Sequence, residues 1–370
     1  MIARTLLLAG LWSLLMACGG GGSSSPPPEP PVAQDPAPPE DPQPRTYSGP
    51  GSRWDVNLNP DATFSIERRA TIDSAVVLTV EGNYQALDNG FVQFFISAAE
   101  GEDAPAPGDT AWAVEVPGFA IFLKPDDSPF AGFISMIDAG SCPEGDLNAS
   151  WIAVKTAASA AADTDHPHMG AFTYEALRQS VELTGRYALN GTDLGALDIG
   201  QGTCQDGVLM TERGPVYLAD AGGGLVHTAD DDPAEREILF AMESVALETV
   251  SELDGEYLGL YFEPNNPVAD NVSPTLVTCS AGLCTGQILD GLDAALAVSS
   301  YELNLFGTLN APVAGTIAGN IENETAAGEL ACQVRMNVGS ENQKLVTCVG
   351  QNPADATAHV NIVLTNQPAD

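Results

Sequence analysis

Basic residues are scarce in this chain of 370 residues. It has 13 Lys and Arg against 50 Asp and Glu, which gives a formal net charge of −37 at pH 7. Lysine is confined to Lys124, Lys155 and Lys344. A surface of this sign repels the phosphate backbone of nucleic acids and anionic lipid headgroups. We therefore expect no nucleic-acid partner.

The motifs of the common catalytic centres are missing as well. There is no Gly-x-Ser-x-Gly, Ser-x-x-Lys, phosphate-binding loop, Gly-x-Gly-x-x-Gly or His-Glu-x-x-His pattern. With 50 acidic residues, a glycosidase-like pair of carboxylates can be drawn at many places and identifies none of them. The sequence thus predicts that the protein is not an enzyme. A secreted hydrolase using dispersed carboxylates stays open as a weaker alternative.

The acidic residues are scattered along the chain and form no Asp-x-Asp-x-Asp-Gly loop of the calcium-binding type. Two interpretations remain for them. One is adaptation to a saline habitat, where salt screens the self-repulsion of the surface. The other is a cation-binding function, which the missing calcium loop makes the less favoured interpretation.

The N-terminus carries the clearest motif of the chain. Arg4 precedes an apolar run over residues 6–16, and the run ends in Leu15-Met16-Ala17-Cys18. An apolar segment of about a dozen residues is too short to span a bilayer and is typical of a signal peptide. The motif resembles the lipobox of bacterial lipoproteins with type II signal peptides. An ordinary secretory signal with an incidental cysteine is the alternative.

That resemblance covers residues 1–45 only and implies a location, not an activity. It implies removal of residues 1–17, lipidation of Cys18 (palmitate included) and anchoring in the outer membrane, since Gly and not Asp follows Cys18. The Cys-Gly-Gly-Gly-Gly-Ser start opens a Gly-, Ser- and Pro-rich linker over residues 18–45. Its prolines favour an extended polyproline II conformation without a folded core, so we expect a disordered linker.

Cysteine usage indicates an oxidising compartment. Beyond Cys18 there are six cysteines: Cys142, Cys204, Cys279, Cys284, Cys332 and Cys348. Cys332 and Cys348 lie at opposed positions of a predicted hairpin over 330–338 and 343–350, within reach of a disulfide. Cys279 and Cys284 form a natural local pair, which leaves Cys142 for Cys204. A metal or redox site at Cys279 and Cys284 is disfavoured, because neither a Cys-x-x-Cys spacing nor a nearby histidine supports it.

From residue 46 onward the chain predicts an all-β fold. Short alternating or apolar runs recur between Gly, Asn, Asp and Pro, which is typical of antiparallel β-sandwich or β-barrel-like domains. The length predicts two such domains, over 46–250 and 251–370. Residues 232–247 are ambiguous between a helix and a hairpin strand, and the alternation of Ile238, Phe240 and Met242 favours the strand.

One short segment combines possible metal ligands: Asp163, Asp165, His166 and His168. Imidazole and carboxylate side chains at this spacing suit zinc or copper. The proline between the two histidines and the Ala-rich approach over residues 157–162 favour an exposed, solvated loop over a rigid site. The sequence therefore predicts no cofactor, with a divalent metal at these residues as a speculative possibility.

The function that follows is a non-enzymatic lipoprotein of the outer membrane. It would present disulfide-linked acidic β-domains, in the periplasm or on the cell surface, to an unknown envelope or surface partner. The alternative is a lipocalin-like carrier of a small apolar ligand. That alternative rests on a Gly-x-aromatic pattern at residues 82–84, 170–172, 185–187 and 255–257, which also opens lipocalin-like barrels.

Overall fold

The structure is a computed structural model. It describes residues 43–49, 53–70, 74–87, 90–124, 132–156, 166–227, 237–244, 247–264, 271–292, 297–306, 313–323, 326–338, 342–353, 355 and 358–366. Pro42–Asp370 form one compact unit, and the fold below is that of this unit. Cys18 and the linker lie outside the described residues. No helix among the described residues has both the length and the apolar character needed to cross a membrane.

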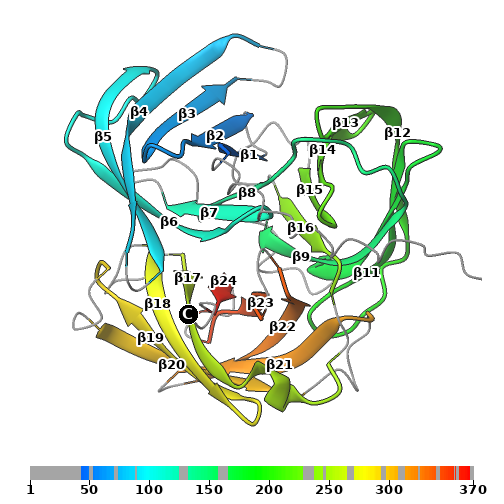
Figure 1. The fold of residues 1–370 in the computed structure, drawn as a ribbon. Helices are drawn as coiled ribbons and strands as arrows, with labels where there is room; N and C mark the ends of the chain where they lie inside the picture. The colour runs from blue at the N-terminus through cyan, green and yellow to red at the C-terminus, as the bar shows by residue number, and fades with distance from the viewer. Residues whose placement is uncertain are drawn as a thin grey trace, which may run out of the picture. The chain divides into compact units, whose positions relative to one another are not determined.

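Three closed barrels of eight strands each make up the fold (Figure 1). Within every barrel each strand pairs antiparallel with the next along the chain, and the last strand returns to the first. Closure of this kind leaves no unpaired strand edge in the sheet. The first barrel is drawn in blue to cyan, the second in green and the third in yellow to red.

The strands of the first barrel are β1 (Arg45–Gly49), β2 (Trp54–Leu58), β3 (Thr63–Arg69), β4 (Val76–Ala86), β5 (Phe91–Gly101), β6 (Thr110–Val116), β7 (Ala120–Lys124) and β8 (Ile134–Ile137). Those of the second are β9 (Leu147–Lys155), β10 (Met169–Glu175), β11 (Ser180–Tyr187), β12 (Leu197–Gln205), β13 (Val208–Thr211), β14 (Gly214–Ala219), β15 (Gly223–His227) and β16 (Ile238–Met242). After the short 3-10 helix η2 (Val250–Leu253), the third barrel comprises β17 (Gly255–Phe262), β18 (Val272–Ser280), β19 (Leu283–Leu289), β20 (Ala297–Leu305), β21 (Thr316–Glu322), β22 (Ala327–Met336), β23 (Lys344–Gln351) and β24 (His359–Thr365).

The all-β class expected from the sequence is confirmed, and the structure has three barrels where two domains were expected. The segment 46–250, taken as one domain, holds the first two barrels. The expected boundary at 250 falls on η2, between the second and third barrels. Within the ambiguous segment, Ile238–Met242 form strand β16, which pairs with β15 from Gly223↔Met242 to His227↔Ile238.

The lumen of each barrel is filled by side chains of its own strands. In β2, buried Trp54, Val56 and Leu58 alternate with the less buried Asp55 and Asn57, as expected when one face of a strand meets a core. The same alternation gives each barrel a separate interior cluster of large apolar side chains. An eight-stranded barrel has an interior just wide enough for such side chains.

A fourth hydrophobic core is shared by all three barrels. Phe119 and Phe122 come from the first barrel, and both rings pack against Phe240 of the second at centroid separations of 6.1 and 5.4 Å. The third barrel adds Leu260 and Val363 to the same cluster. This cluster, called the shared core below, consists of residues that project from the outer faces of the barrels.

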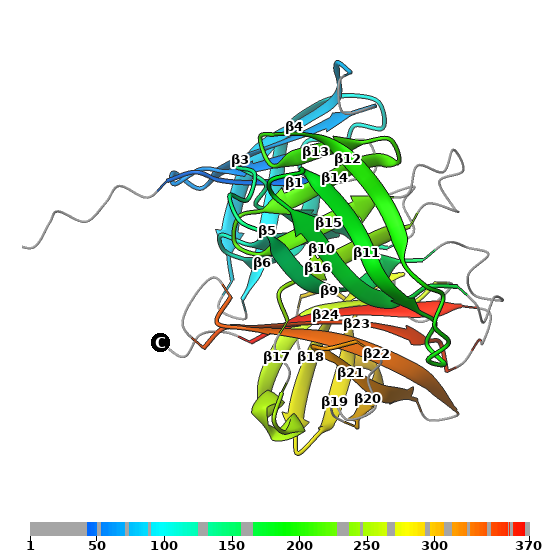
Figure 2. The ribbon, with the colours of Figure 1, turned by 90° about the vertical axis from the view of Figure 1, so that its right-hand side faces the viewer.

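Strands between a lumen and the shared core are buried on both faces. Every residue of β16 and β24 is buried, as are the apolar residues of β7. This explains the continuous apolar runs such as 119–123, because a strand with two buried faces has no reason to alternate. β9 contacts β22, β23 and β24, which places the second barrel directly against the third (Figure 2).

Glycine is required where strands approach closely in the second barrel. A Cβ atom on Gly170 would lie 2.0 Å from the Gly185 carbonyl oxygen and 2.4 Å from Nε1 of Trp151. Trp151 is fully buried in the second lumen. The Gly-x-aromatic pattern at 170–172 is therefore explained by packing within the barrel.

Polar side chains fix the register between the second and third barrels. Nε2 of Gln333 in β22 donates to the Phe240 carbonyl oxygen at 2.8 Å, and Oγ of Ser150 in β9 donates to Oε1 of Gln333 at 3.0 Å. Nδ2 of Asn361 in β24 donates to the Ala153 carbonyl oxygen at 2.7 Å. Buried polar groups with directional partners permit only one docking geometry, whereas apolar contacts alone tolerate sliding.

Arg335 contacts all three barrels at once. From β22 its Nη1 donates to the Gly222 carbonyl oxygen at 2.6 Å, and its Nη2 donates to that of Ala221, both in the β14–β15 turn of the second barrel. Its guanidinium carbon lies 4.5 Å from the ring centroid of Phe119 in the first barrel. Burial lowers the pKa of Arg335, and the nearby charge of Glu243 opposes this effect.

The three predicted cysteine pairs are present as disulfides, which are Cys142–Cys204, Cys279–Cys284 and Cys332–Cys348. The first ties the segment between β8 and β9 to β12, and the other two bridge opposed residues of neighbouring strands.

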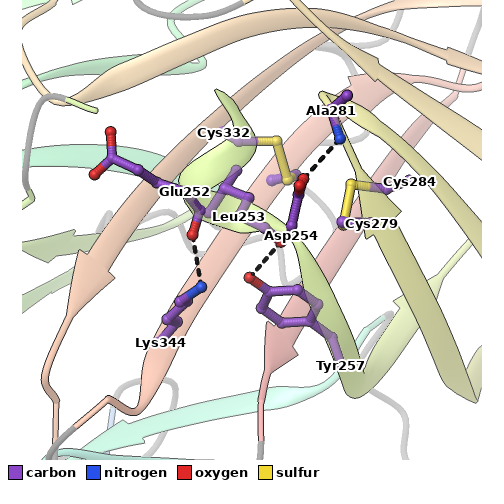
Figure 3. Close-up of a disulfide and its surroundings, with 10 residues drawn as sticks. Glu252, Leu253, Asp254, Tyr257, Cys279, Ala281, Cys284, Cys332 and Lys344 are labelled. Carbon is purple, nitrogen blue, oxygen red and sulfur yellow. Dashed lines mark hydrogen bonds between the residues drawn. A yellow bond between two sulfur atoms is a disulfide. The ribbon is translucent and has the colours of Figure 1, made fainter. Parts of the chain in front are cut away.

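Figure 3 shows two of these disulfides beside η2. There, Nζ of Lys344 donates to the Glu252 carbonyl oxygen, the Tyr257 hydroxyl donates to that of Leu253, and the Ala281 amide donates to Asp254. These hydrogen bonds fix η2, which connects the second barrel to the third, to the strands of the third barrel.

Replacing Arg335 tests the junction between the barrels. We expect Arg335→Ala to lower the free energy of unfolding by about 1–3 kcal/mol, because the Gly222 and Ala221 carbonyl oxygens lose their donor and Phe119 loses its cation. The measurement is urea denaturation followed by tryptophan fluorescence. Arg186→Ala is the matched control, since Arg186 also donates to two carbonyl oxygens but within one exposed segment of the second barrel. Equal losses in the two variants would contradict a special role of the junction.

Candidate functional site: a histidine cluster between two barrels

Three histidines and one glutamate meet where the second barrel faces the third. His166 and His168, two of the residues singled out from the sequence, are joined there by His359 and Glu237. Asp163 and Asp165, the other two residues of the predicted metal site, lie outside the described residues. We call His166, His168, His359 and Glu237 the histidine cluster.

Backbone pairing sets the position of His168 in front of β10. The Ala153 amide donates to the His168 carbonyl oxygen at 2.8 Å, and the His168 amide donates to that of Tyr187 at 2.9 Å. His168 thus extends the sheet between β9 and β11, although it precedes the first residue of β10. The expected exposed loop does not include His168, whose residue is 2% exposed.

His359 and Glu237 come from other parts of the chain. His359 is the first residue of β24 and pairs with Gln351 of β23, and Glu237 directly precedes β16. His166 and Glu237 are in contact through Nε2 and Oε1. The cluster therefore combines three segments of the second and third barrels that are far apart in the sequence.

The rings of the cluster are close together, and three ring nitrogens of His168 and His359 lack hydrogen-bond partners. The centroids of His168 and His359 are 4.4 Å apart, and those of His166 and His168 are 5.7 Å apart. Both ring nitrogens of His168 and Nδ1 of His359 are buried without a partner. Such atoms cost about 1–3 kcal/mol each when they stay unsatisfied, which makes them candidates for binding an absent group.

Burial keeps two of these histidines neutral. It lowers the pKa of His168 to about 3; the electrostatic influence of the neighbouring His359 and His166 rings acts in the same direction, and the backbone of His166 opposes it. Burial, with His166 as a second cause, lowers the pKa of His359 to about 4. At neutral pH each ring therefore keeps a lone pair on one nitrogen, which is the form that ligates metals.

The cluster as it stands is not a completed metal centre. In the part of the chain that the structure describes, no group of three or more His, Cys, Asp or Glu side chains is arranged to hold a metal ion. The rings of His168 and His359 contact each other instead, at an interplanar angle of 41°. Any metal would therefore require these rings to turn.

Sequence reasoning missed His359 and Glu237. His359 was isolated in the sequence, and its one local signal is its position at the start of the apolar run 359–365. Glu237 is one of many acidic residues and carries no local signal. Only the packing of β24 against the second barrel brings them to His166 and His168.

A second feature lies at the end of the second barrel where β10 turns into β11. Leu177 in that turn is fully exposed, and Met210 in β13 is 41% exposed. The turn contacts β12, because the Gly202 amide donates to the Gln179 carbonyl oxygen. β12 in turn pairs with β13 through Thr203 and Met210. The turn and Met210 are therefore separated by about two strand spacings, or about 10 Å. We call Leu177 and Met210 the apolar tip.

Comparison with known proteins identifies no family for this chain. No protein-family model and no curated protein matches the chain. Among solved structures, a mutant of transferrin binding protein B from Haemophilus parasuis matches with a TM-score of 0.28 and 8% identity, over 87% of this chain and 66% of that one. The isotype 1 protein from serogroup B Neisseria meningitidis matches with a TM-score of 0.27 and 10% identity, over 86% and 66%.

A third match is a protein of unknown function from the DUF3598 family of Nostoc punctiforme. Its TM-score is 0.23 and its identity 11%, over 60% of this chain and 96% of that one. The chain spans just under two thirds of the length of the two transferrin binding proteins. TM-scores this low support no conclusion about the function of this chain.

Stability should depend on pH through the buried histidines. A histidine whose pKa is lowered by folding takes up its proton more readily in the unfolded chain, so the free energy of unfolding falls as the pH falls below the ordinary value of 6.5. Between pH 6.5 and 4.5 the loss from His168 is on the order of 2 kcal/mol.

The variant His168→Phe keeps an aromatic ring and cannot titrate. We expect its unfolding free energy, measured in metal-free buffer, to fall less over this pH range than that of the unmodified chain. Asn361→Ala weakens the same contact between barrels without changing a titrating group, so its curve should run parallel to that of the unmodified chain. A parallel curve for His168→Phe would refute the burial argument.

Proposed function

We propose that the chain is a non-enzymatic, lipid-anchored binding protein of the bacterial cell envelope. Cys18 would hold it in the outer membrane, residues 19–45 would separate it from the lipid, and the three barrels would form a rigid body that meets a protein partner. The observation that carries the binding role is the apolar tip, where a fully exposed leucine stands on a closed and filled barrel.

The filled lumens support this proposal over the lipocalin-like carrier. The interior of the first barrel contains Trp54, Phe64 and Phe94, that of the second Trp151 and Phe172, all buried. A carrier of the lipocalin type holds its ligand in the lumen of the barrel. Since bulky side chains occupy these interiors, we place recognition on the outer surface.

The apolar tip fits a partner with an apolar pocket and a basic rim. An exposed large apolar side chain is costly in water and gains free energy when a partner covers it. The net charge of −37 would steer a basic partner towards the protein and discourage acidic ones. The disulfides suit the oxidising compartment in which such a partner would be met.

Site-specific photo-crosslinking in intact cells tests the binding role. A photoreactive residue at Leu177 should give one discrete crosslinked product. The same residue at Leu283, an exposed leucine of the third barrel, is the matched control and should give none. Equal crosslinking at both positions, or none at either, would contradict recognition by the apolar tip.

The anchor is tested by Cys18→Ala. We expect the unmodified protein to incorporate labelled palmitate and to sediment with outer membranes, whereas the variant should incorporate no label and leave the outer-membrane fraction. Ala17→Ser, which keeps the lipid-bearing cysteine, controls for altered processing. Membrane association of Cys18→Ala equal to that of the unmodified protein would refute lipid anchoring.

A further inference from the structure

Two members of the histidine cluster, His168 and His359, offer ring nitrogens that the fold leaves without partners. His168 is 2% exposed and His359 is 7% exposed, and three of their four ring nitrogens are buried and unbonded. Proteins seldom bury such groups without a ligand, a water or an ion to satisfy them. The three histidines come from two barrels, so a ligand shared by them would connect those barrels.

We propose that His166, His168 and His359 bind one divalent transition-metal ion of the zinc class between the second and third barrels, with Glu237 as the carboxylate that orients His166. The proposal concerns a site of its own and does not rest on the binding role of the apolar tip. The proposed ligand set differs from the one predicted from the sequence: His359 and Glu237, which the fold brings close, take the place of Asp163 and Asp165.

Ring positions are compatible with this site after small rotations. With zinc–nitrogen bonds of about 2.0–2.1 Å and tetrahedral angles, the centres of two imidazole ligands lie about 5 Å apart. The observed separations of 4.4 Å and 5.7 Å lie on either side of that value. Binding therefore requires the rings of His168 and His359, which are tilted by 41° to each other, to turn about their side-chain bonds.

Glu237 supplies a feature that recurs around histidine-bound zinc. A ligating histidine commonly places its second ring nitrogen on a carboxylate, which fixes the ring and strengthens it as a ligand. Nε2 of His166 already contacts Oε1 of Glu237, so Nδ1 is the nitrogen that would face the metal.

The test is titration of the full chain, purified in mild detergent and stripped with a chelator, with zinc chloride by calorimetry and with cobalt chloride by visible absorption. We expect one ion per chain and the absorption of tetrahedral cobalt. His168→Ala and His359→Ala should each weaken binding by more than about 100-fold, and Glu237→Gln by about 10- to 100-fold. Asn361→Ala, which alters the same contact between barrels without removing a ligand, should bind like the unmodified chain.

Zinc should also raise the melting temperature of the unmodified chain and leave that of His359→Ala unchanged, which separates ligand loss from misfolding of a variant. Absence of stoichiometric zinc in the unmodified chain would overturn the proposal. So would undiminished binding in both histidine variants. Either result leaves the crosslinking test at Leu177 unaffected, so the two proposals fail independently.

Discussion

Burial of the outer barrel faces in one shared core is the constraint on which the rest of the structure depends. A closed barrel with a filled lumen needs no neighbour, yet β7, β16 and β24 carry apolar side chains on their outer faces as well. At about 25 cal/mol per Å² of apolar surface, leaving these faces in water would be strongly unfavourable. The three barrels therefore form one body, in agreement with the single compact unit of Pro42–Asp370.

Directional contacts then select one arrangement of this body. Gln333 and Asn361 of the third barrel donate hydrogen bonds to backbone carbonyl oxygens of the second. Arg335 of the third barrel contacts both other barrels. The histidine cluster lies at the same contact between the second and third barrels and, within the described residues, contains buried ring nitrogens without hydrogen-bond partners. Structural rigidity and the proposed metal site thus have the same origin, which is the close approach of β24 to the second barrel.

Local features of this fold could be predicted from the sequence, whereas the closure of the strands into three barrels could not. The hairpin that pairs Cys332 with Cys348 follows from alternation about a turn, and the β15–β16 hairpin follows from Ile238, Phe240 and Met242. The number of barrels depends on pairings such as Ser48↔Ile137, which join the first and last strands of a barrel. Such pairings connect residues far apart in the chain and produce no periodic pattern in the sequence. For the same reason His168 was predicted as an exposed loop residue, and His359 and Glu237 were not connected with it.

Native-state hydrogen exchange tests the shared core most directly. Amides in β7, β16 and β24 belong to three different barrels and would exchange through one common opening if the barrels unfold together. We predict the same free energy of opening for the slowest amides of these three strands, and an equal decrease in all three with Arg335→Ala. Exchange of β24 through an opening that leaves β7 and β16 protected would show that the third barrel unfolds on its own, and would contradict the account.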